Sequence, residues 1–420
     1  MRWTGLMVLA ACSSGSGGGD TTISFDGAGR GFVRNDATGE LCEDSCVIAS
    51  EEASAGDAPS AQLRLTAFAL SQLGGWTGCD EVMGDTCVVA AERAHDLRVA
   101  FERDEHEVAT LTPPFPITTG AFAEGGFVLA SPQQIARVDA AAQPIWTVQP
   151  GAVAVRVAPS GDVYALRAAT VARFDAAGAP RWERSIGAAS MDLLPGGDVA
   201  LATADAVTVL AAADGSVLWT RSAPLAQSIA VRPQGEIAVG TGNAVILRFD
   251  RDGAALADRA LPQTGASQVA FDAAGHLHAQ VVRFEPSPTD PGGFRTQRTI
   301  VRYDDAGGVA DTDTDEVTQT GSGFAVGAGR LAWRHLFAFF HTTTVDAGAY
   351  LEASDASGAP AWTLSKITRG SIGNGSSVLS QQVQVTDAAC DGASRCAVFG
   401  TYLYSSGQSR LPWMEILTVP

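Results

Sequence analysis

The stretch VARFDAAGAPRW, Val171 to Trp182, decides the fold of this chain because it recurs. Its neighbours IARVDAAAQPIW (Ile135 to Trp146) and VTVLAAADGSVLW (Val207 to Trp219) carry the same order of residues. Each copy has an alternating aliphatic run, a turn with Asp or Gly, and a Trp, which indicates two strands joined by a turn. Strand-like repeats with a period of roughly 35–45 residues are typical of radial or solenoid arrays.

Three further copies follow, and two of them lack the Trp. VILRFDRDGAALA (Val245 to Ala257) and IVRYDDAGGVAD (Ile300 to Asp311) end on Ala and Asp, whereas LEASDASGAPAW (Leu351 to Trp362) restores the Trp. We therefore expect the fourth and fifth repeats to pack less well than the others.

A second phrase alternates with the first. It is a hairpin of period-2 strands around a Gly turn, as in AVRVAPSGDVYAL (Ala154 to Leu166) and IAVRPQGEIAVG (Ile229 to Gly240). Seven such hairpins, counting a shorter first copy at Ala121 to Ala130, give four strands per repeat. The sequence predicts an all-β chain with a seven-bladed β-propeller over residues 120–420, although six to eight blades fit the pattern.

The Asp-x-x-Gly-x-x-x-Trp phrase resembles the repeat of quinoprotein-like propellers with PQQ-type repeats. In that family the Trp packs between neighbouring blades, so the resemblance implies a structural role for four tryptophans. The matching positions are Asp139, Asp175 and Asp355, then Gly178, Gly215 and Gly358, then Trp146, Trp182, Trp219 and Trp362. The resemblance implies the fold and no particular activity, because enzymes and scaffolds share the blade.

The sequence predicts no cofactor, metal or catalytic residue. Family members that bind the quinone place adjacent cysteines and a calcium-binding acidic cluster over the axis, and no two Cys are adjacent here. DTDTDE (Asp311 to Glu316) lacks the Gly turn of a calcium loop, which favours a solvated acidic loop. His276 and His278 share one strand face, but no third metal ligand is identifiable, which favours a core or tunnel-facing pair.

The N-terminus resembles that of bacterial lipoproteins. Leu9-Ala10-Ala11-Cys12 matches the lipobox, which implies a signal peptide over residues 1–11 and lipidation of Cys12. Residues 12–20 then form a Gly/Ser tether. The serines after Cys12, with no Asp beside it, favour transport to the outer membrane. The alternative is an ordinary N-terminal segment that happens to contain a Cys and is not lipidated.

The other six cysteines fall in close pairs. An even number in an exported chain predicts disulfides, and the short spacings favour local bridges. The pairs are Cys42 with Cys46, Cys79 with Cys87, and Cys390 with Cys396. A zinc site built from four of them is the alternative, and the lack of CxxC spacing disfavours it.

Residues 21–103 are predicted to form a small, disulfide-stapled β domain, followed by a proline-rich linker over residues 104–119. The strand order and the Gly-Trp-x-Gly-Cys phrase resemble the divergent internalin-type bacterial repeat module. The resemblance implies that Trp76 is a core plug, with a sugar-stacking platform as the alternative. It rests on Leu63, Leu65, Gly75, Trp76, Gly78, Cys79, Cys87, Val89, Val99 and Phe101.

Two inserts interrupt the later repeats. Residues 284–297 lengthen the fifth, and Arg334 to Gly348 carries an aromatic run in the sixth. Phe337, Phe339 and Phe340 are interpreted as strand core with one exposed edge residue, and an exposed contact for a partner is the alternative.

The charge balance excludes some partners. The chain has 28 Lys and Arg against 46 Asp and Glu, a net charge of −18, whereas nucleic acids and anionic lipids need a basic surface. We predict a non-enzymatic, lipid-anchored protein of the bacterial envelope whose propeller is a scaffold for an unknown envelope or extracellular protein. Propeller lipoproteins that it resembles scaffold envelope proteins, one of them in outer-membrane barrel assembly. The alternative is a propeller enzyme, a quinone-dependent oxidoreductase or a hydrolase, with its site at the axis.

Overall fold

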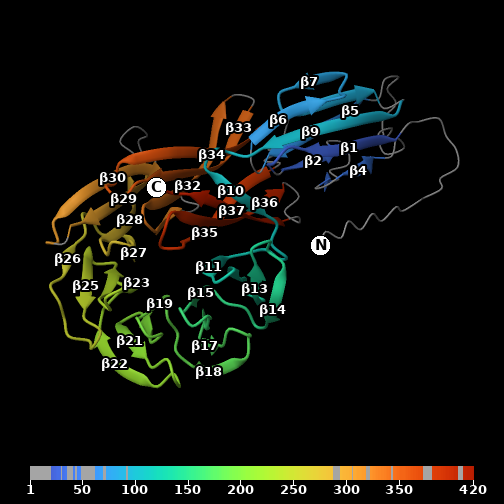
Figure 1. Cartoon of the computed structure of the whole chain (residues 1–420). Coiled ribbons are helices and arrows are strands. Elements are labelled where there is room, and N and C mark those ends of the chain that lie inside the picture. The colour runs from blue at the N-terminus through green and yellow to red at the C-terminus, as the bar shows by residue number, and fades with distance from the viewer. Residues whose placement is uncertain are drawn as a thin grey trace. The chain divides into compact units, whose positions relative to one another are not determined.

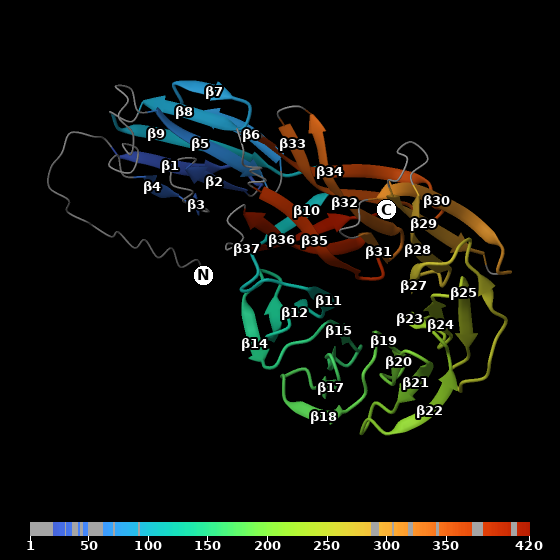
Figure 2. The same ribbon diagram turned by 180° about the vertical axis from the view of Figure 1, so that it is seen from behind.

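The chain is all-β in the parts that the structure, a computed structural model, describes (Figures 1 and 2). It divides into two compact units, Met1–Glu105 and His106–Pro420. None of the described residues belongs to a helix long and apolar enough to cross a membrane. The described residues are 20–29, 31–35, 41–42, 45–48, 62–69, 72–90, 93–286, 294–304, 306–317, 322–341, 344–371, 381–404 and 410–420. Cys12, the signal peptide and the tether up to residue 19 lie outside them.

The first unit consists of two sheets. One has the order β4-β1-β9-β6, from β4 (Cys46–Ile48), β1 (Thr21–Asp26), β9 (His95–Glu102) and β6 (Gln72–Thr77). The other has the order β3-β2-β5-β8-β7, from β3 (Leu41–Cys42), β2 (Gly31–Asn35), β5 (Gln62–Ala69), β8 (Thr86–Ala90) and β7 (Glu81–Met83). The apolar residues of β5, β8 and β9 alternate inward, so their side chains share one core.

Trp76 belongs to this core. Its side chain is buried, and its Nε1–H donates a hydrogen bond to the Asp85 carbonyl at 2.9 Å. The disulfides Cys42–Cys46 and Cys79–Cys87 form as predicted, each across a short loop. The small disulfide-stapled β domain is confirmed, and its resemblance to internalin-type modules stays a prediction.

The second unit is a β-propeller, as predicted, whose described residues form seven four-stranded sheets (Figure 1). Each sheet is an antiparallel meander, which we number as blades 1 to 7; the count of seven stays a prediction that these sheets support. The first three blades are β11 (Thr119–Ala123), β12 (Gly126–Ala130), β13 (Ile135–Asp139), β14 (Pro144–Val148); β15 (Ala154–Val157), β16 (Val163–Leu166), β17 (Val171–Phe174), β18 (Pro180–Arg184); and β19 (Ser190–Leu193), β20 (Val199–Ala202), β21 (Ala206–Leu210), β22 (Val217–Ser222).

The next three blades continue the meander in chain order. They are β23 (Ala226–Val231), β24 (Ile237–Thr241), β25 (Val245–Phe249), β26 (Arg259–Ala260); β27 (Ala266–Phe271), β28 (Leu277–Pro286), β29 (Phe294–Tyr303), β30 (Val309–Val317); and β31 (Ser322–Val326), β32 (Arg330–His341), β33 (Thr344–Ser354), β34 (Pro360–Ser371).

Blade 7 closes the ring with a strand from the other end of the unit. Its order is β35 (Gln381–Cys390), β36 (Arg395–Tyr404), β37 (Arg410–Thr418) and then β10 (Glu107–Leu111). The prediction of a linker over residues 104–119 is corrected here, because β10 lies within that range and pairs with β37. Within that range, residues 104–106 and 112–118 lack a strand. The short edge strand β10 gave little sequence signal.

The core of the propeller is a ring of layers between neighbouring blades. All four residues of β16 and of β20 are buried, because each sheet has another sheet against both of its faces. Apolar clusters accordingly combine consecutive blades, such as Val128 and Ala130 of β12 with Val163 and Ala165 of β16. Burial of both faces explains why the second strand of each blade is almost wholly apolar.

The two predicted inserts lengthen strands. Residues of the first insert continue β28 and β29, where Phe284 pairs with Thr296. The second insert extends β32 and β33 to 12 and 11 residues, whereas the strands of blade 2 have four or five. The side chains of Phe337, Phe339 and Phe340 lie outside the described part of the structure.

Candidate functional site

The recurring Asp fixes the outer turn of blades 1, 2, 4 and 6. In blade 2, Asp175 Oδ1 accepts hydrogen bonds from the N–H groups of Ala177 (3.0 Å) and Ala179 (2.8 Å). Asp139, Asp250 and Asp355 accept the same pair of bonds in their blades. An Asp that bonds to N–H groups two and four residues later holds a tight turn, which Gly178 completes with a φ of 83°.

The recurring Trp lies on the turn of the next blade. A Cβ on Gly215 would lie 2.9 Å from Cδ2 of Trp182, so only Gly leaves room for the ring. Trp182 Nε1–H also donates to the Ala212 carbonyl of that turn at 2.8 Å. The same two contacts join Trp146 to Gly178 and Ala176, and Trp219 to Gly253 and Arg251. Gly and Trp therefore recur together because they touch across a blade junction.

The four tryptophans differ in burial. Trp182 is buried, at 9% exposure, whereas Trp146, Trp219 and Trp362 are half-buried. Trp362 donates to the Thr418 carbonyl at 3.0 Å and stacks on the His106 ring at 4.8 Å, so it joins blade 6 to the closing sheet. All four stand on the outermost strand of their blades, where a side chain can keep one edge in solvent.

Charged side chains take the place of the two missing tryptophans. Ala257 does not reach the next turn; instead the Arg259 guanidinium lies where a Cβ on Gly307 would be. Asp311 holds the Trp position of blade 5, and its carboxylate faces Gly358. A cavity of about 350 Å³ lies beside Asp311 and is lined also by Arg330 and Trp362. The sequence showed the loss of Trp but gave no signal for its replacement by Arg259.

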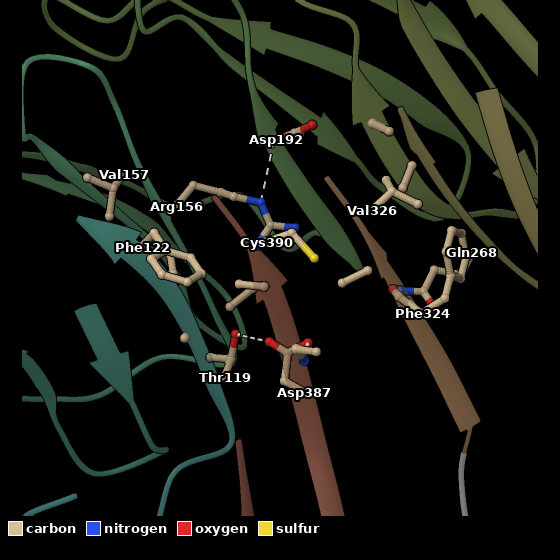
Figure 3. A pocket seen from close by; sticks show the side chains of 18 of the residues that line it. Thr119, Phe122, Arg156, Val157, Asp192, Gln268, Phe324, Val326, Asp387 and Cys390 are labelled. Carbon is tan, nitrogen blue, oxygen red and sulfur yellow. Dashed lines mark hydrogen bonds and ion pairs between the residues drawn. The ribbon is translucent and has the colours of Figure 1, made fainter. Parts of the chain in front are cut away.

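The inner strands of all seven blades line one axial cavity of about 640 Å³ (Figure 3). Most of its wall is apolar or hydroxyl-bearing, with Phe122, Phe271 and Phe324 as its aromatic residues. Four charged side chains line it, namely Arg156, Asp192, Asp387 and Asp391. None of them was singled out from the sequence, since acidic residues are abundant in this chain.

One ion pair crosses the wall between blades 2 and 3. Arg156 Nε of β15 lies 3.4 Å from Asp192 Oδ1 of β19, as the upper dashed line of Figure 3 shows. Asp192 Oδ2 accepts the N–H of Val231 in blade 4 at 2.7 Å. Burial raises the pKa of Asp192, against the opposing effect of Arg156. One carboxylate thus ties three blades together at the axis.

A second carboxylate joins blade 7 to blade 1. Thr119 Oγ1 of β11 donates to Asp387 Oδ2 of β35 at 2.7 Å, and the Ala388 N–H donates to Asp387 Oδ1 at 2.9 Å (Figure 3). Burial raises the pKa of Asp387 despite these donors. This contact bridges the two ends of the propeller.

The third predicted disulfide, Cys390–Cys396, forms across β35 and β36 at the cavity. Beside it, Arg395 Nε pairs with Asp391 Oδ2 at 2.7 Å while its guanidinium lies 5.7 Å from the Phe122 ring centroid. The rim of the cavity therefore holds a guanidinium between a carboxylate and an aromatic ring.

The two histidines that were weighed as metal ligands are bonded to a carboxylate of the protein. His276 Nδ1 and His278 Nε2 both lie within hydrogen-bond distance of Asp272 Oδ2, at 3.0 and 3.2 Å. Burial alone would raise the pKa of Asp272, but its hydrogen bonds with the two histidines and the His276 N–H lower it to about 2. Burial lowers the pKa of His278. The sequence-based search for a third polar group missed Asp272, which the turn brings back to the strand.

The acidic run Asp311 to Glu316 lies in β30, so the prediction of a loop is corrected. The outer strand of a blade is half exposed and tolerates this composition. Asp313 lies 3.3 Å from Arg330 of blade 6, and Asp311 lies 3.9 Å from it. Within the described residues no group of three or more His, Cys, Asp or Glu side chains is placed to hold a metal ion.

Solved structures share this fold at low identity. U3-55K aligns with 74% of this chain and 98% of its own, at a TM-score of 0.53 and 7% identity. Raptor from Chaetomium thermophilum aligns with 75% of this chain at a TM-score of 0.51 and 9% identity, although only 29% of Raptor is covered. BamB from Moraxella catarrhalis aligns with 84% of this chain and 93% of its own, at a TM-score of 0.40 and 13% identity. Protein-family models and curated proteins give no match to this chain. Identities this low show the fold alone.

Proposed function

We propose that this chain is a non-enzymatic, lipid-anchored protein of the bacterial envelope, and that its propeller is a scaffold that binds another envelope or extracellular protein. The observation that carries the proposal is the open axial cavity, a concave site whose wall comes from all seven inner strands. Cross-blade bonds at Asp192 and Asp387 hold that wall in place before any partner arrives. A preformed concave surface lowers the entropic cost of binding.

Export to an oxidising compartment is supported by the cysteines. Three disulfides use all six cysteines after Cys12, and such bonds persist outside the cytosol. The lipobox-like Leu9 to Cys12 supplies the anchor, and the first β unit stands between the tether and the propeller in the chain. In this proposal the membrane is contacted through the lipid alone, and the outer membrane is the destination.

The scaffold is tested by cross-linking at the cavity mouth. A photo-reactive residue replaces Val153, which lines the cavity and is 53% exposed, and a matched variant carries it at Val309 on β30, which is 59% exposed. We expect a discrete protein adduct in intact cells from position 153 and not from position 309. No adduct at 153, or the same adducts at both positions, contradicts the proposal.

The anchor has its own test. Cys12→Ser removes the thiol that would be acylated, so the variant should stay an uncleaved precursor and leave the detergent phase in phase partitioning. Cys390→Ser, which alters a cysteine far from the lipobox, should still enter the detergent phase. A Cys12→Ser protein that partitions into detergent contradicts lipidation at this residue.

A propeller enzyme is the second candidate, because Asp192 and Asp387 have raised pKa values at the axis, as general acids do. Binding is favoured over catalysis since each carboxylate oxygen already accepts a hydrogen bond or an ion pair from the wall. Incubating the purified protein with pyrroloquinoline quinone and Ca²⁺ separates the two. A stoichiometric, tightly bound chromophore establishes the quinone-dependent enzyme and removes the scaffold proposal.

A further inference from the structure

The axial cavity carries one negative charge that no cation balances. Asp391 is paired with Arg395, and Asp192 is paired with Arg156. In the part of the chain that the structure describes, Asp387 forms no ion pair; it is held by the Thr119 hydroxyl and by the N–H groups of Ala388 and Gly120. Arg156 forms its ion pair with Asp192, and its positive charge lowers the pKa of Asp387 from a longer distance.

Burial makes this uncompensated charge costly. Desolvation raises the pKa of Asp387, and its hydrogen bonds and Arg156 offset only part of that effect. A cation that enters the cavity would restore the lost stabilisation of the carboxylate. The net charge of −18 would also attract cations toward the protein over longer distances.

The Asp387 carboxylate can accept a further hydrogen bond, and an N–H donor fits this capacity. An ionised carboxylate accepts about four hydrogen bonds, and Asp387 accepts three, from the Thr119 hydroxyl and from the N–H groups of Ala388 and Gly120. A divalent metal ion would need several oxygen ligands, and the described residues offer no such group. Ammonium and guanidinium groups need only the carboxylate and an aromatic or polar wall.

At the rim of the same cavity, the protein already holds one of its own guanidinium groups between a carboxylate and an aromatic ring. The Arg395 guanidinium is held by Asp391 and lies over the ring of Phe122, as in a cation–π contact. Asp387 lies on β35, and Asp391 follows directly after the last residue of that strand. Phe271 and Phe324 add further aromatic rings to the wall of the cavity. The cavity therefore contains the carboxylate and the aromatic surface that a second cation requires.

We propose that the axial cavity binds an alkylammonium or guanidinium group through the Asp387 carboxylate. This deepens the scaffold function on which it rests, since the cation is then the lysine or arginine side chain of the bound protein. A free alkylamine carries the same chemistry and is the other source. Arg156 contributes in two ways, because it pairs with Asp192 and its positive charge favours the ionised form of Asp387.

The test measures binding of n-butylammonium and ethylguanidinium chlorides to the purified full chain by calorimetry at low salt. We expect saturable binding that Asp387→Asn weakens about tenfold or more, the factor for one charge-assisted hydrogen bond. Asp205→Asn removes an equal charge from an exposed position outside the cavity lining and should bind like the parent protein. Equal binding by Asp387→Asn, or equal binding of neutral n-butanol, overturns the proposal.

A second variant guards against a folding defect in the first. Asp387→Glu keeps a carboxylate at this position and should bind n-butylammonium more tightly than Asp387→Asn does, which a general folding defect at position 387 would not produce. An Asp387→Glu protein that matches the parent in circular dichroism and binds no better than Asp387→Asn overturns the proposal.

The source of the cation is decided with a capped Gly-Gly-Lys-Gly-Gly peptide and its norleucine counterpart. Tighter binding of the lysine peptide than of n-butylammonium assigns the site to a partner's side chain, and equal or weaker binding assigns it to a free amine. The small probes report on the cavity alone. Cross-linking at Val153 reports on the scaffold, so failure of one is distinguishable from failure of the other.

Discussion

At the scale of single residues, the propeller is held by one repeated contact between an indole and a glycine. Trp182 and Gly215 show it most fully, because the ring is buried and its Nε1–H is satisfied by the Ala212 carbonyl. The glycine has two tasks there: its φ of 70° suits the turn, and its missing side chain leaves room for the ring. Either substitution, at the Gly or at the Trp, would break the same junction.

We predict that Trp182→Ala lowers the free energy of unfolding by about 3–5 kcal/mol, because it leaves a cavity and an unpaired carbonyl. Trp146→Ala should cost less, since that ring is half-buried. Urea denaturation of the purified chain measures both. Ile145→Ala, on the exposed side of the same strand, should change stability by less than about 0.5 kcal/mol. Equal effects of the three substitutions would show that the indole does not join the blades.

A second residue-scale prediction concerns Asp272. Its pKa is lowered from 3.8 to about 2 in the folded protein, so folding favours the ionised carboxylate. The resulting stabilisation, about 2 kcal/mol, is fully present above pH 4 and disappears as the pH falls through 2. Asp272→Asn should flatten the dependence of stability on pH in that window. Acid titration followed by circular dichroism, with exposed Asp205→Asn as the control, measures this; an unchanged slope contradicts it.

At the scale of elements, the closing strand β10 determines whether the propeller is a ring. It pairs with β37 through residues 107–111, and Thr110 and Glu107 are buried and bonded to each other at 2.5 Å. Without β10, β37 would become an exposed edge strand. The disulfide Cys390–Cys396 then remains as a staple within blade 7 and does not replace the closure.

We predict that replacing residues 107–111 with a Gly/Ser segment of equal length destabilises the propeller by about 1 kcal/mol for each ladder hydrogen bond lost. Thermal unfolding should begin at lower temperature, and amide protection should fall first in β37. The same replacement at residues 81–85, which include the edge strand β7 of the first unit, is the control and should leave the protection of β37 unchanged. Unchanged protection of β37 would mean that closure through β10 does not stabilise the ring.

At the scale of the whole molecule, the propeller's junctions are unequal. Blades 1, 2, 3 and 6 each place a Trp on the following sheet, whereas blades 4 and 5 use Arg259 and Asp311. A charged side chain fills less of the junction than an indole, and the cavity of about 350 Å³ beside Asp311 is consistent with that. Because the blades form a closed ring, a weak junction destabilises the blades on both of its sides. Local opening should still start at the weakest junction.

We predict that amides of residues 245–315 exchange before those around Trp146, Trp182 and Trp219. Hydrogen exchange followed by mass spectrometry measures the order. Asp311→Trp restores the repeat and should raise protection in blade 5 specifically. Protection that is highest in residues 245–315 would show that the tryptophans record the ancestry of the repeat and do not set its present stability.

The sequence by itself determined the architecture, because the contacts that define a blade repeat at a fixed spacing. Asp turns, positive-φ glycines and alternating strands are local, so VARFDAAGAPRW and its copies predicted strands, turns and the propeller. The short cysteine spacings predicted the three disulfides for the same reason.

Only the tertiary structure decided the axial site and the closure of the ring. Thr119 and Asp387 are 268 residues apart, and they meet only after the last blade has returned to the first. Arg259 takes a Trp's place from a position that the repeat does not mark, and β10 is a strand because β37 lies beside it. Each of these contacts depends on where separate blades end up in space. A period read along the chain carries no information about such pairings, because they arise from ring closure rather than from local spacing.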